Sequence, residues 1–228
     1  MTKLRILKVV FDTQLAPYQI ESFRGAMSHK VGLEHEWFHN HDNESGGFHF
    51  RYPLIQYKLD KNGEQLRPML VCLNVGIEEL QHYFTQTDWS LRIDKDIHEM
   101  RVAKLDVNQY NLLEFSEMRR YQLSKWQPFN QQKHKEFQAL TGLVERVQFM
   151  ENCLVAHILA FCRGVDWQLD NRLEVRITAI SDPKAIKFKN IMVDTYNIQF
   201  DCNIFLPDKI GLGKGSAHGY GTVRGVRI

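Results

Sequence analysis

Five of the ten histidines lie close together in the first quarter of the chain. They are His29, His35, His39, His41 and His49, which fall within 21 residues. Because the unperturbed pKa of histidine is about 6.5, an imidazole can accept or donate a proton near neutral pH. His39 and His41 are two positions apart, so in an extended chain their rings point to one side, about 7 Å apart. Such a pair can act as an acid and a base; the alternative is a solvated histidine loop.

A metal site is the chemical rival in the same region. His35 and His39 would lie one helical turn apart if the preceding helix continued, and His41, Asp42 and Glu44 would add ligands. The sequence has neither an HExxH nor an HxHxDH motif here, and no cysteine is nearby. The string HNH at 39–41 is not the dispersed motif of the HNH nucleases. We therefore expect neither a metal nor another cofactor.

Basic residues alternate with aromatic residues at several places, among them 51–52, 57–58 and 187–189. Lysine and arginine suit phosphate groups, and aromatic faces suit unpaired bases. At each place the alternative is ordinary strand alternation, with aromatic residues inward and basic residues outward. The candidate phosphate contacts are Lys30, Arg51, Lys58, Lys187 and Lys189.

Glycines gather near the C-terminus, where residues 211–225 read GLGKGSAHGYGTVRG and hold six of the fourteen glycines. Glycine permits positive φ and close approach of a partner, and exposed backbone N–H groups bind phosphate oxygens. The segment is not a P-loop, because Lys214 is followed by glycine, and no βαβ unit follows it. The alternative is a tightly turned terminal connection.

Two groups of motifs carry a family resemblance. The segment from Leu206, LPDKIGLGKGSAHGYGTVRGV, resembles the glycine-rich loop of the CRISPR-associated endoribonucleases that process precursor CRISPR RNA, members of the repeat-associated RNA-binding (RAMP) superfamily. FRGAMSHKVG at 23–32, HNH at 39–41 and FRYPLIQYK at 50–58 are similar to the N-terminal half of one branch of that family. Together the motifs span both halves of the chain.

The resemblance implies metal-independent cleavage of CRISPR repeat RNA by attack of a ribose 2′-OH, leaving a 5′-hydroxyl and a 2′,3′-cyclic phosphate. His39 and His41 match the catalytic position and are our candidate acid/base pair, with the two roles not assigned. A cation must steady the transition state, and Lys30, Arg51, Lys58 and Lys214 are the candidates. In the glycine-rich loop the resemblance implies RNA contacts by Gly211, Gly213, Lys214, Gly215, Ser216, His218, Gly219, Tyr220 and Gly221.

A different class of function is a non-catalytic RNA-binding subunit of the same superfamily, which would not need the histidine pair. A 2′,5′-phosphoesterase is disfavoured, because the chain lacks paired HxT or HxS motifs at this place. Besides the RNA, we expect as partners a second copy in a homodimer or other CRISPR-associated proteins.

The elements that position these residues follow from periodicity. We predict a strand at 3–11, a helix at 17–30, a long loop at 31–47, strands at 48–59 and 69–73 around a turn at 61–63, a helix at 77–84, and a strand or hairpin at 90–106. The second half predicts a strand at 110–127, a helix at 133–163 broken at Gly142, and strands at 173–180, 185–192 and 196–205. This order predicts an α+β fold of two tandem ferredoxin-like (βαββαβ) domains, at 1–107 and 108–228.

Composition sets the outer limits. The chain has 228 residues, of which 43% are hydrophobic and 25% charged, with a net charge of +2. These values predict a folded core and argue against a polybasic tail, and the net charge alone does not indicate a nucleic-acid partner. The four cysteines form no CxxC pair, and the longest apolar run is too short to cross a bilayer. We therefore expect a cytoplasmic protein with reduced cysteines and no membrane insertion.

Overall fold

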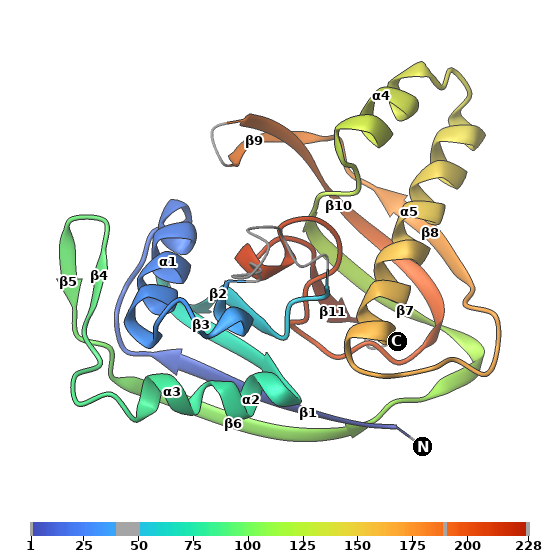
Figure 1. Ribbon diagram of the computed structural model, residues 1–228. Coiled ribbons are helices and arrows are strands. Elements are labelled where there is room, and N and C mark those ends of the chain that lie inside the picture. The colour runs from blue at the N-terminus through green and yellow to red at the C-terminus, as the bar shows by residue number, and fades with distance from the viewer. Residues whose placement is uncertain (1, 40–50, 189–190, 227–228) are drawn as a thin grey trace. The chain divides into compact units, whose positions relative to one another are not determined.

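The computed structural model describes residues 2–39, 51–188 and 191–226 and divides into two compact units (Figure 1). The N-terminal unit contains residues 2–111 together with 217–219, and the C-terminal unit contains 112–216 and 220–228. Both units combine helices with an antiparallel sheet, so the predicted α+β fold of two ferredoxin-like units is confirmed. The domain boundary at 107/108 stays a prediction.

The N-terminal unit is built on a four-stranded antiparallel sheet in the order β2-β3-β1-β6. Its elements are β1 (Lys3–Phe11), η1 (Pro17–Gln19), α1 (Ile20–Val31), η2 (Glu36–Phe38), β2 (Ile55–Asn62), β3 (Gln65–Leu73), α2 (Val75–Glu79), α3 (Gln81–Phe84), the hairpin β4 (Leu91–Ile93) and β5 (Asp96–His98), and β6 (Val102–Asn111). The central strand β1 pairs with β3 on one side and β6 on the other. This order is that of a βαββαβ unit.

One hydrophobic core joins the helices of this unit to one face of its sheet. Phe23 and Met27 of α1 and Tyr83 of α3 lie in the same cluster as Phe11 of β1 and Tyr57 of β2, and all five are fully buried. Phe11 packs edge-on against Phe23 and Tyr83, and Phe23 packs edge-on against Tyr57. Such aromatic contacts fix α1 and α3 over the sheet.

The C-terminal unit repeats the strand order with β11-β7-β10-β8, and β9 pairs with the start of β10. Its elements are β7 (Glu114–Trp126), α4 (Gln131–Ala139), α5 (Leu143–Gly164), β8 (Val175–Ile180), β9 (Lys184–Phe188), β10 (Ile191–Ile204), η3 (Ser216–His218) and β11 (Thr222–Gly225). The predicted apolar stripe of α5 is buried at Met150, Leu154, Ile158 and Phe161. The helix break expected at Gly142 is confirmed, because this glycine precedes the first residue of α5.

Four sequence expectations were wrong in detail. Residues 48–50 of the strand predicted at 48–59 lie outside the described residues, but 51–54 form no strand, and β2 begins at Ile55, after Pro53, which lacks a backbone N–H for a sheet ladder. The single helix expected at 77–84 is two short helices, α2 and α3. The strand break expected between Met192 and Tyr196 does not occur, since β10 runs through it, and the glycine-rich segment contributes an unpredicted strand, β11. No helix in the described part of the chain is long and apolar enough to span a bilayer.

Candidate functional site

The candidate site is built around the segment that follows α1. The helix ends at Gly32, whose φ of 104° is a conformation that side-chain-bearing residues rarely adopt. After this turn the chain forms η2 and reaches His39. Phe38 is 1% exposed and belongs to the core, so it anchors the segment beside α1.

Three side chains converge on the carbonyl groups at the end of η2. Ser28 Oγ and Tyr57 Oη each donate to the Phe38 carbonyl over 3.2 Å. Arg24 Nε donates to the same oxygen over 3.4 Å, and Arg24 Nη2 donates to the His39 carbonyl. Arg24 and Ser28 are four residues apart, so they share one face of α1. The backbone at His39 is thereby held from both the helix and the sheet.

The His39 ring has a defined orientation. It is 9% exposed, and its Nε2 lies 2.8 Å from the Leu33 carbonyl. Because a carbonyl oxygen only accepts, Nε2 must carry a hydrogen. The His39 backbone N–H donates to the Glu36 carbonyl over 3.2 Å. Ring and backbone are thus both fixed by the same short segment.

Arg24 also contacts the tip of the glycine-rich loop, which belongs to the N-terminal unit. Its Nη1 lies 2.7 Å from His218 Nε2. A guanidinium only donates, so His218 accepts through Nε2. Next to it, a Cβ on Gly219 would lie 3.3 Å from Ile20 Cδ1 and 3.4 Å from the Tyr57 carbonyl oxygen. One arginine therefore connects the histidine segment with the loop tip.

The local electrostatics follow from burial. Burial lowers the pKa of Arg24, an effect partly offset by Tyr57 and Glu21. Burial also raises the pKa of Tyr57, so its hydroxyl stays protonated and donates to the Phe38 carbonyl. Arginine keeps its charge in proteins, so the site holds a fixed cation whose donors are directed at two carbonyl groups and a histidine.

The other basic candidates of the N-terminal unit have contacts or burial of their own, and in the described part of the chain none of these contacts is a bond to the His39 carbonyl. Lys30 forms an ion pair with Asp88 at 3.0 Å, and this pair is partly exposed. Arg51 stacks on Trp37, 3.8 Å from the ring centroid, and lies 3.6 Å from a Glu36 carboxylate oxygen. Lys58 is 2% exposed, so its ammonium does not face solvent. His41 and Lys189 lie outside the described residues, as does the side chain of Lys187 in β9.

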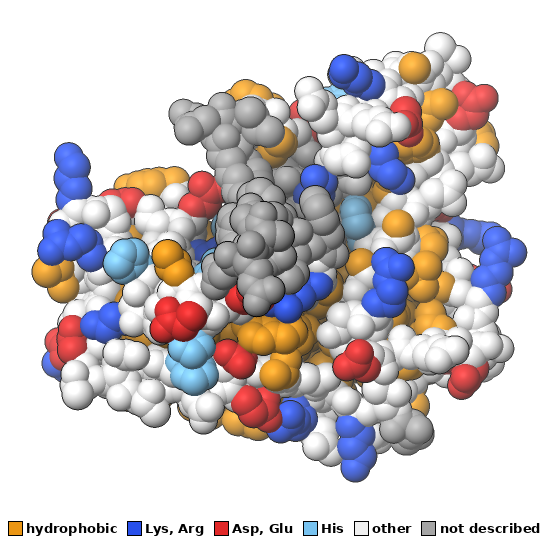
Figure 2. All heavy atoms as spheres, in the orientation of Figure 1, with side chains coloured by type: hydrophobic (Ala, Val, Ile, Leu, Met, Phe, Trp, Pro, Cys, Tyr) orange, Lys and Arg blue, Asp and Glu red, His pale blue; other side chains and the backbone are white. Residues whose placement is uncertain are grey.

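The remainder of the glycine-rich loop is held within the C-terminal unit. Leu212 N–H donates to the Gly221 carbonyl over 2.8 Å, and Lys214 N–H donates to the Gln127 carbonyl over 3.1 Å. Among the predicted RNA contacts, Lys214 is exposed, Gly213, Gly215, Gly219 and Tyr220 are partly exposed, and Gly211, Ser216, His218 and Gly221 are buried. On the face drawn in Figure 2, basic and acidic side chains are interspersed.

Family models match nearly the whole chain. Residues 2–111 match the Cas6b N-terminal domain, and residues 113–226 match the Cas6b C-terminal domain. The chain belongs to the Cas6b family. This finding confirms the predicted relationship to the CRISPR-associated endoribonucleases. No curated protein sequence matches the chain significantly.

Solved structures share the fold of this Cas6b-family chain. A crystal structure of Cas6b has 21% identity and a TM-score of 0.83, covering 99% of this chain and 100% of that one. A CRISPR RNA processing endoribonuclease Cas6b has 18% identity and a TM-score of 0.72, with the same coverage. The type IV Cas6 crRNA endonuclease Csf5 has 10% identity and a TM-score of 0.61, again over 99% and 100%.

Arg24 is the site residue that sequence analysis did not single out. It lies within the quoted segment FRGAMSHKVG, one helical turn before Ser28. Its partners are two backbone carbonyls and a histidine 194 residues away. The sequence did contain a signal for this role. An arginine and a serine stand four residues apart on the helix that precedes the histidine segment.

Proposed function

We propose that this Cas6b-family chain is an endoribonuclease that processes CRISPR RNA by a metal-independent attack of a ribose 2′-OH. The observation that carries the proposal is the match of both halves to Cas6b domain models. A structural neighbour that covers the full chain is itself a CRISPR RNA processing endoribonuclease. His39, held at the end of η2, supplies the proton-transfer group that the reaction needs.

Two imidazoles are enough for both proton transfers of this reaction, one as the base and one as the acid. A base removes the proton of the 2′-OH, the 2′-oxygen forms a bond to phosphorus, and the bond from phosphorus to the 5′-oxygen breaks. An acid then protonates the departing 5′-oxygen. The products are a 2′,3′-cyclic phosphate and a 5′-hydroxyl. Each proton transfer contributes about 10² to 10⁴ in rate.

His39 and His41 are the proposed acid/base pair. At His39 the proton moves through Nδ1, because Nε2 donates to the Leu33 carbonyl. Arg24 acts as a positioning residue, since its three donor contacts hold the Phe38 and His39 carbonyls and His218. Holding a catalytic ring in place lowers the entropic part of the barrier.

The RNA contacts are proposed for the loop and for the basic residues predicted outside it. Lys214 is exposed between two partly exposed glycines, Gly213 and Gly215, which permit close approach of an RNA backbone. Lys30, Arg51, Lys187 and Lys189 add positive charge, whereas the buried Lys58 is better suited to a structural role. Pairing in a homodimer, or with other CRISPR-associated proteins, stays a prediction that light scattering with and without repeat RNA can test.

The test is cleavage of a repeat-containing RNA in EDTA by the wild type, His39→Ala and His41→Ala. His29→Ala is the matched control, because His29 is an exposed histidine of α1. We expect the wild type and the control to cut, and both site variants to bind RNA but cut far more slowly. Binding without cutting by the wild type would favour a non-catalytic RNA-binding subunit. Cutting that is lost in EDTA and restored by Zn²⁺ or Mn²⁺ would contradict the mechanism.

A further inference from the structure

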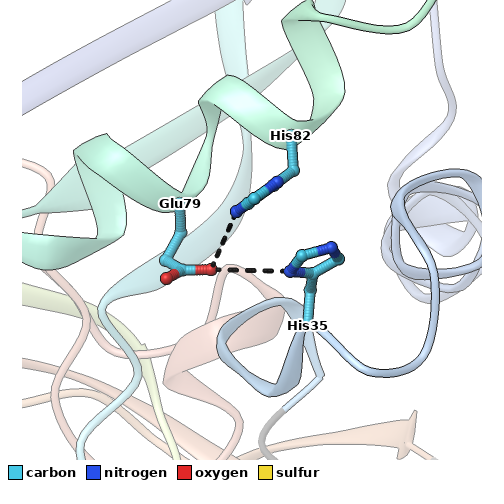
Figure 3. A group of neighbouring side chains, drawn as sticks. All are labelled: His35, Glu79 and His82. Atoms are coloured by element: carbon cyan, nitrogen blue, oxygen red, sulfur yellow. Dashed lines mark ion pairs between the residues drawn. The ribbon is translucent and has the colours of Figure 1, made fainter.

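Two histidines and a glutamate from separate segments of the N-terminal unit meet outside the site described above (Figure 3). His35 Nδ1 and His82 Nε2 each lie 3.9 Å from Glu79 Oε2. The two imidazole rings stack with centroids 3.8 Å apart. Each residue offers one possible metal-binding atom, and these three atoms all lie within 4.8 Å of one another.

The backbone around this cluster is anchored by the core. Glu79 and His82 are three residues apart and flank Leu80, which is 1% exposed, while Tyr83 is fully buried. On the opposite side, His35 precedes η2, which is anchored by the buried Phe38. The side chains of His35, Glu79 and His82 are 24%, 22% and 37% exposed, so an ion from solvent can reach them.

We propose that His35, Glu79 and His82 form a binding site for a divalent transition metal, with Zn²⁺ as the best-suited ion. Two imidazole nitrogens and one carboxylate oxygen form a ligand set that zinc accepts, with water in the fourth position. Tetrahedral zinc with bonds of about 2.1 Å places its donors about 3.4 Å apart. The two 3.9 Å separations exceed that value by about 0.5 Å, so the three partly exposed side chains, including the stacked rings, must rotate when the ion binds.

The surroundings of His35 support this assignment. Its second ring nitrogen, Nε2, lies 3.9 Å from Glu34 Oε1. A metal-bound histidine usually donates its other ring N–H to a carboxylate, a carbonyl or water, and the Glu34 carboxylate is in ion-pair range but beyond hydrogen-bond distance. Arg51 interacts electrostatically with Glu79, but it is also paired with Glu36 and stacked on Trp37.

The bound ion would tie the segment after α1 to the helices α2 and α3. His35 lies between Leu33 and His39, which are joined by the bond from His39 Nε2 to the Leu33 carbonyl. Because metal bound only by the folded chain adds its binding free energy to stability, the melting temperature must rise with zinc concentration. This consequence does not depend on RNA or on catalysis.

The test uses the full chain, stripped with EDTA and dialysed, then titrated with Zn²⁺ and separately with Co²⁺. We expect one equivalent of Zn²⁺ that survives gel filtration, a rise in melting temperature, and a visible Co²⁺ spectrum. His35→Gln, Glu79→Gln and His82→Gln should each abolish all three. His29→Gln and Glu78→Gln are matched controls that should retain them, because Glu78 is paired with Arg5.

Imidazole resonances of the wild type give a second readout that does not depend on any variant folding. Zn²⁺ should shift the ring signals of His35 and His82 and leave those of His29 and His134 unchanged. Failure of the wild type to bind Zn²⁺, or retention of the ion by all three variants, would overturn the proposal. The second result would place the ion elsewhere, for example at the histidines and carboxylates of 39–49.

Discussion

The N-terminal unit orders its strands β2-β3-β1-β6, and the C-terminal unit orders its strands β8-β10-β7-β11, so one antiparallel arrangement occurs twice. The units differ in their connections. In the N-terminal unit the chain between α1 and β2 carries η2 and His39. In the C-terminal unit the place of the second helix, between β10 and β11, holds the glycine-rich segment with only the short η3.

The candidate site lies in the connections and not in the repeated elements. The strands and helices that occur in both units form the two hydrophobic cores. The candidate site instead uses the connecting segments in which the two units differ. The N-terminal connection is fixed by side chains, since Arg24, Ser28 and Tyr57 donate to its carbonyls. The C-terminal connection is fixed by backbone bonds and by glycines, and only its tip contacts Arg24.

The largest effect is expected at the N-terminal connection. His39→Ala removes a proton-transfer group, so the single-turnover rate of repeat RNA cleavage should fall by about 10² to 10⁴. RNA affinity, measured by filter binding, should change by less than about tenfold. An equal loss of cleavage rate in His29→Ala would contradict a specific role for His39 in proton transfer.

A smaller effect is expected at Arg24, which contacts both the segment after α1 and the tip of the glycine-rich loop. Arg24→Gln removes the guanidinium that holds the Phe38 and His39 carbonyls, and misplacement of a catalytic group can cost up to about 10² in rate. We expect the cleavage rate to fall about 10- to 100-fold, with a smaller change in RNA affinity. Arg92→Gln, at an exposed arginine of the same unit, is the control. A normal cleavage rate in Arg24→Gln would rule out the positioning role.

The glycine-based connection can be tested by adding one methyl group. A Cβ at Gly221, where φ is 59°, would overlap the carbonyl oxygen of Leu212. Gly63 has nearly the same φ, 60°, with open space around its Cβ position, so Gly63→Ala is a matched control for backbone strain alone. Gly221→Ala should lower the free energy of unfolding by about 1 to 3 kcal/mol more than the control does, measured in urea. Equal losses would show that the loop adapts to the methyl group.

The smallest effect is a pH dependence of the C-terminal unit. Trp126 Nε1 donates to His157 Nδ1 over 3.2 Å, and burial, with Lys133 and Lys214 nearby, lowers the pKa of His157 to about 4. The unfolded chain therefore binds this proton more readily. The stabilisation is complete above pH about 6.5 and is lost as the pH falls toward about 4.

Comparison with His157→Gln isolates this contribution. The wild type should lose about 1 to 3 kcal/mol of unfolding free energy relative to the variant between pH 7 and pH 4. The measurement is urea unfolding followed by circular dichroism at each pH. Parallel pH curves for the two proteins would contradict the assigned pKa shift.

Hydrophobic periodicity predicted the helices and strands whose apolar residues all face one core. The stripe of α5, the helix break at Gly142 and the strands around the Asn62-Gly63 turn all follow from local spacing and turn chemistry. The start of β2 was misplaced because alternating residues before Pro53 continue the strand pattern. The strand β11 was missed because glycine-rich sequence gives no apolar alternation.

The site was predictable only in part, because its contacts are tertiary. The type and spacing of His39 pointed to proton transfer, but its tautomer depends on the Leu33 carbonyl. The role of Arg24 depends on His218, which is far away in the sequence. Lys58 is buried with the other three residues at the start of β2, and its predicted contact with phosphate stays a prediction.

The chemistry of the cleaved ends distinguishes attack by the ribose 2′-OH from metal-dependent hydrolysis. A repeat RNA would be cut by the wild type in EDTA and the products weighed by mass spectrometry, beside an RNA with a single 2′-deoxyribose at the cut site. We expect a 2′,3′-cyclic phosphate (or the phosphate formed by its opening) and a 5′-hydroxyl, with no cutting of the deoxy RNA. A 5′-phosphate and a 3′-hydroxyl, or cutting at the 2′-deoxyribose, would contradict it.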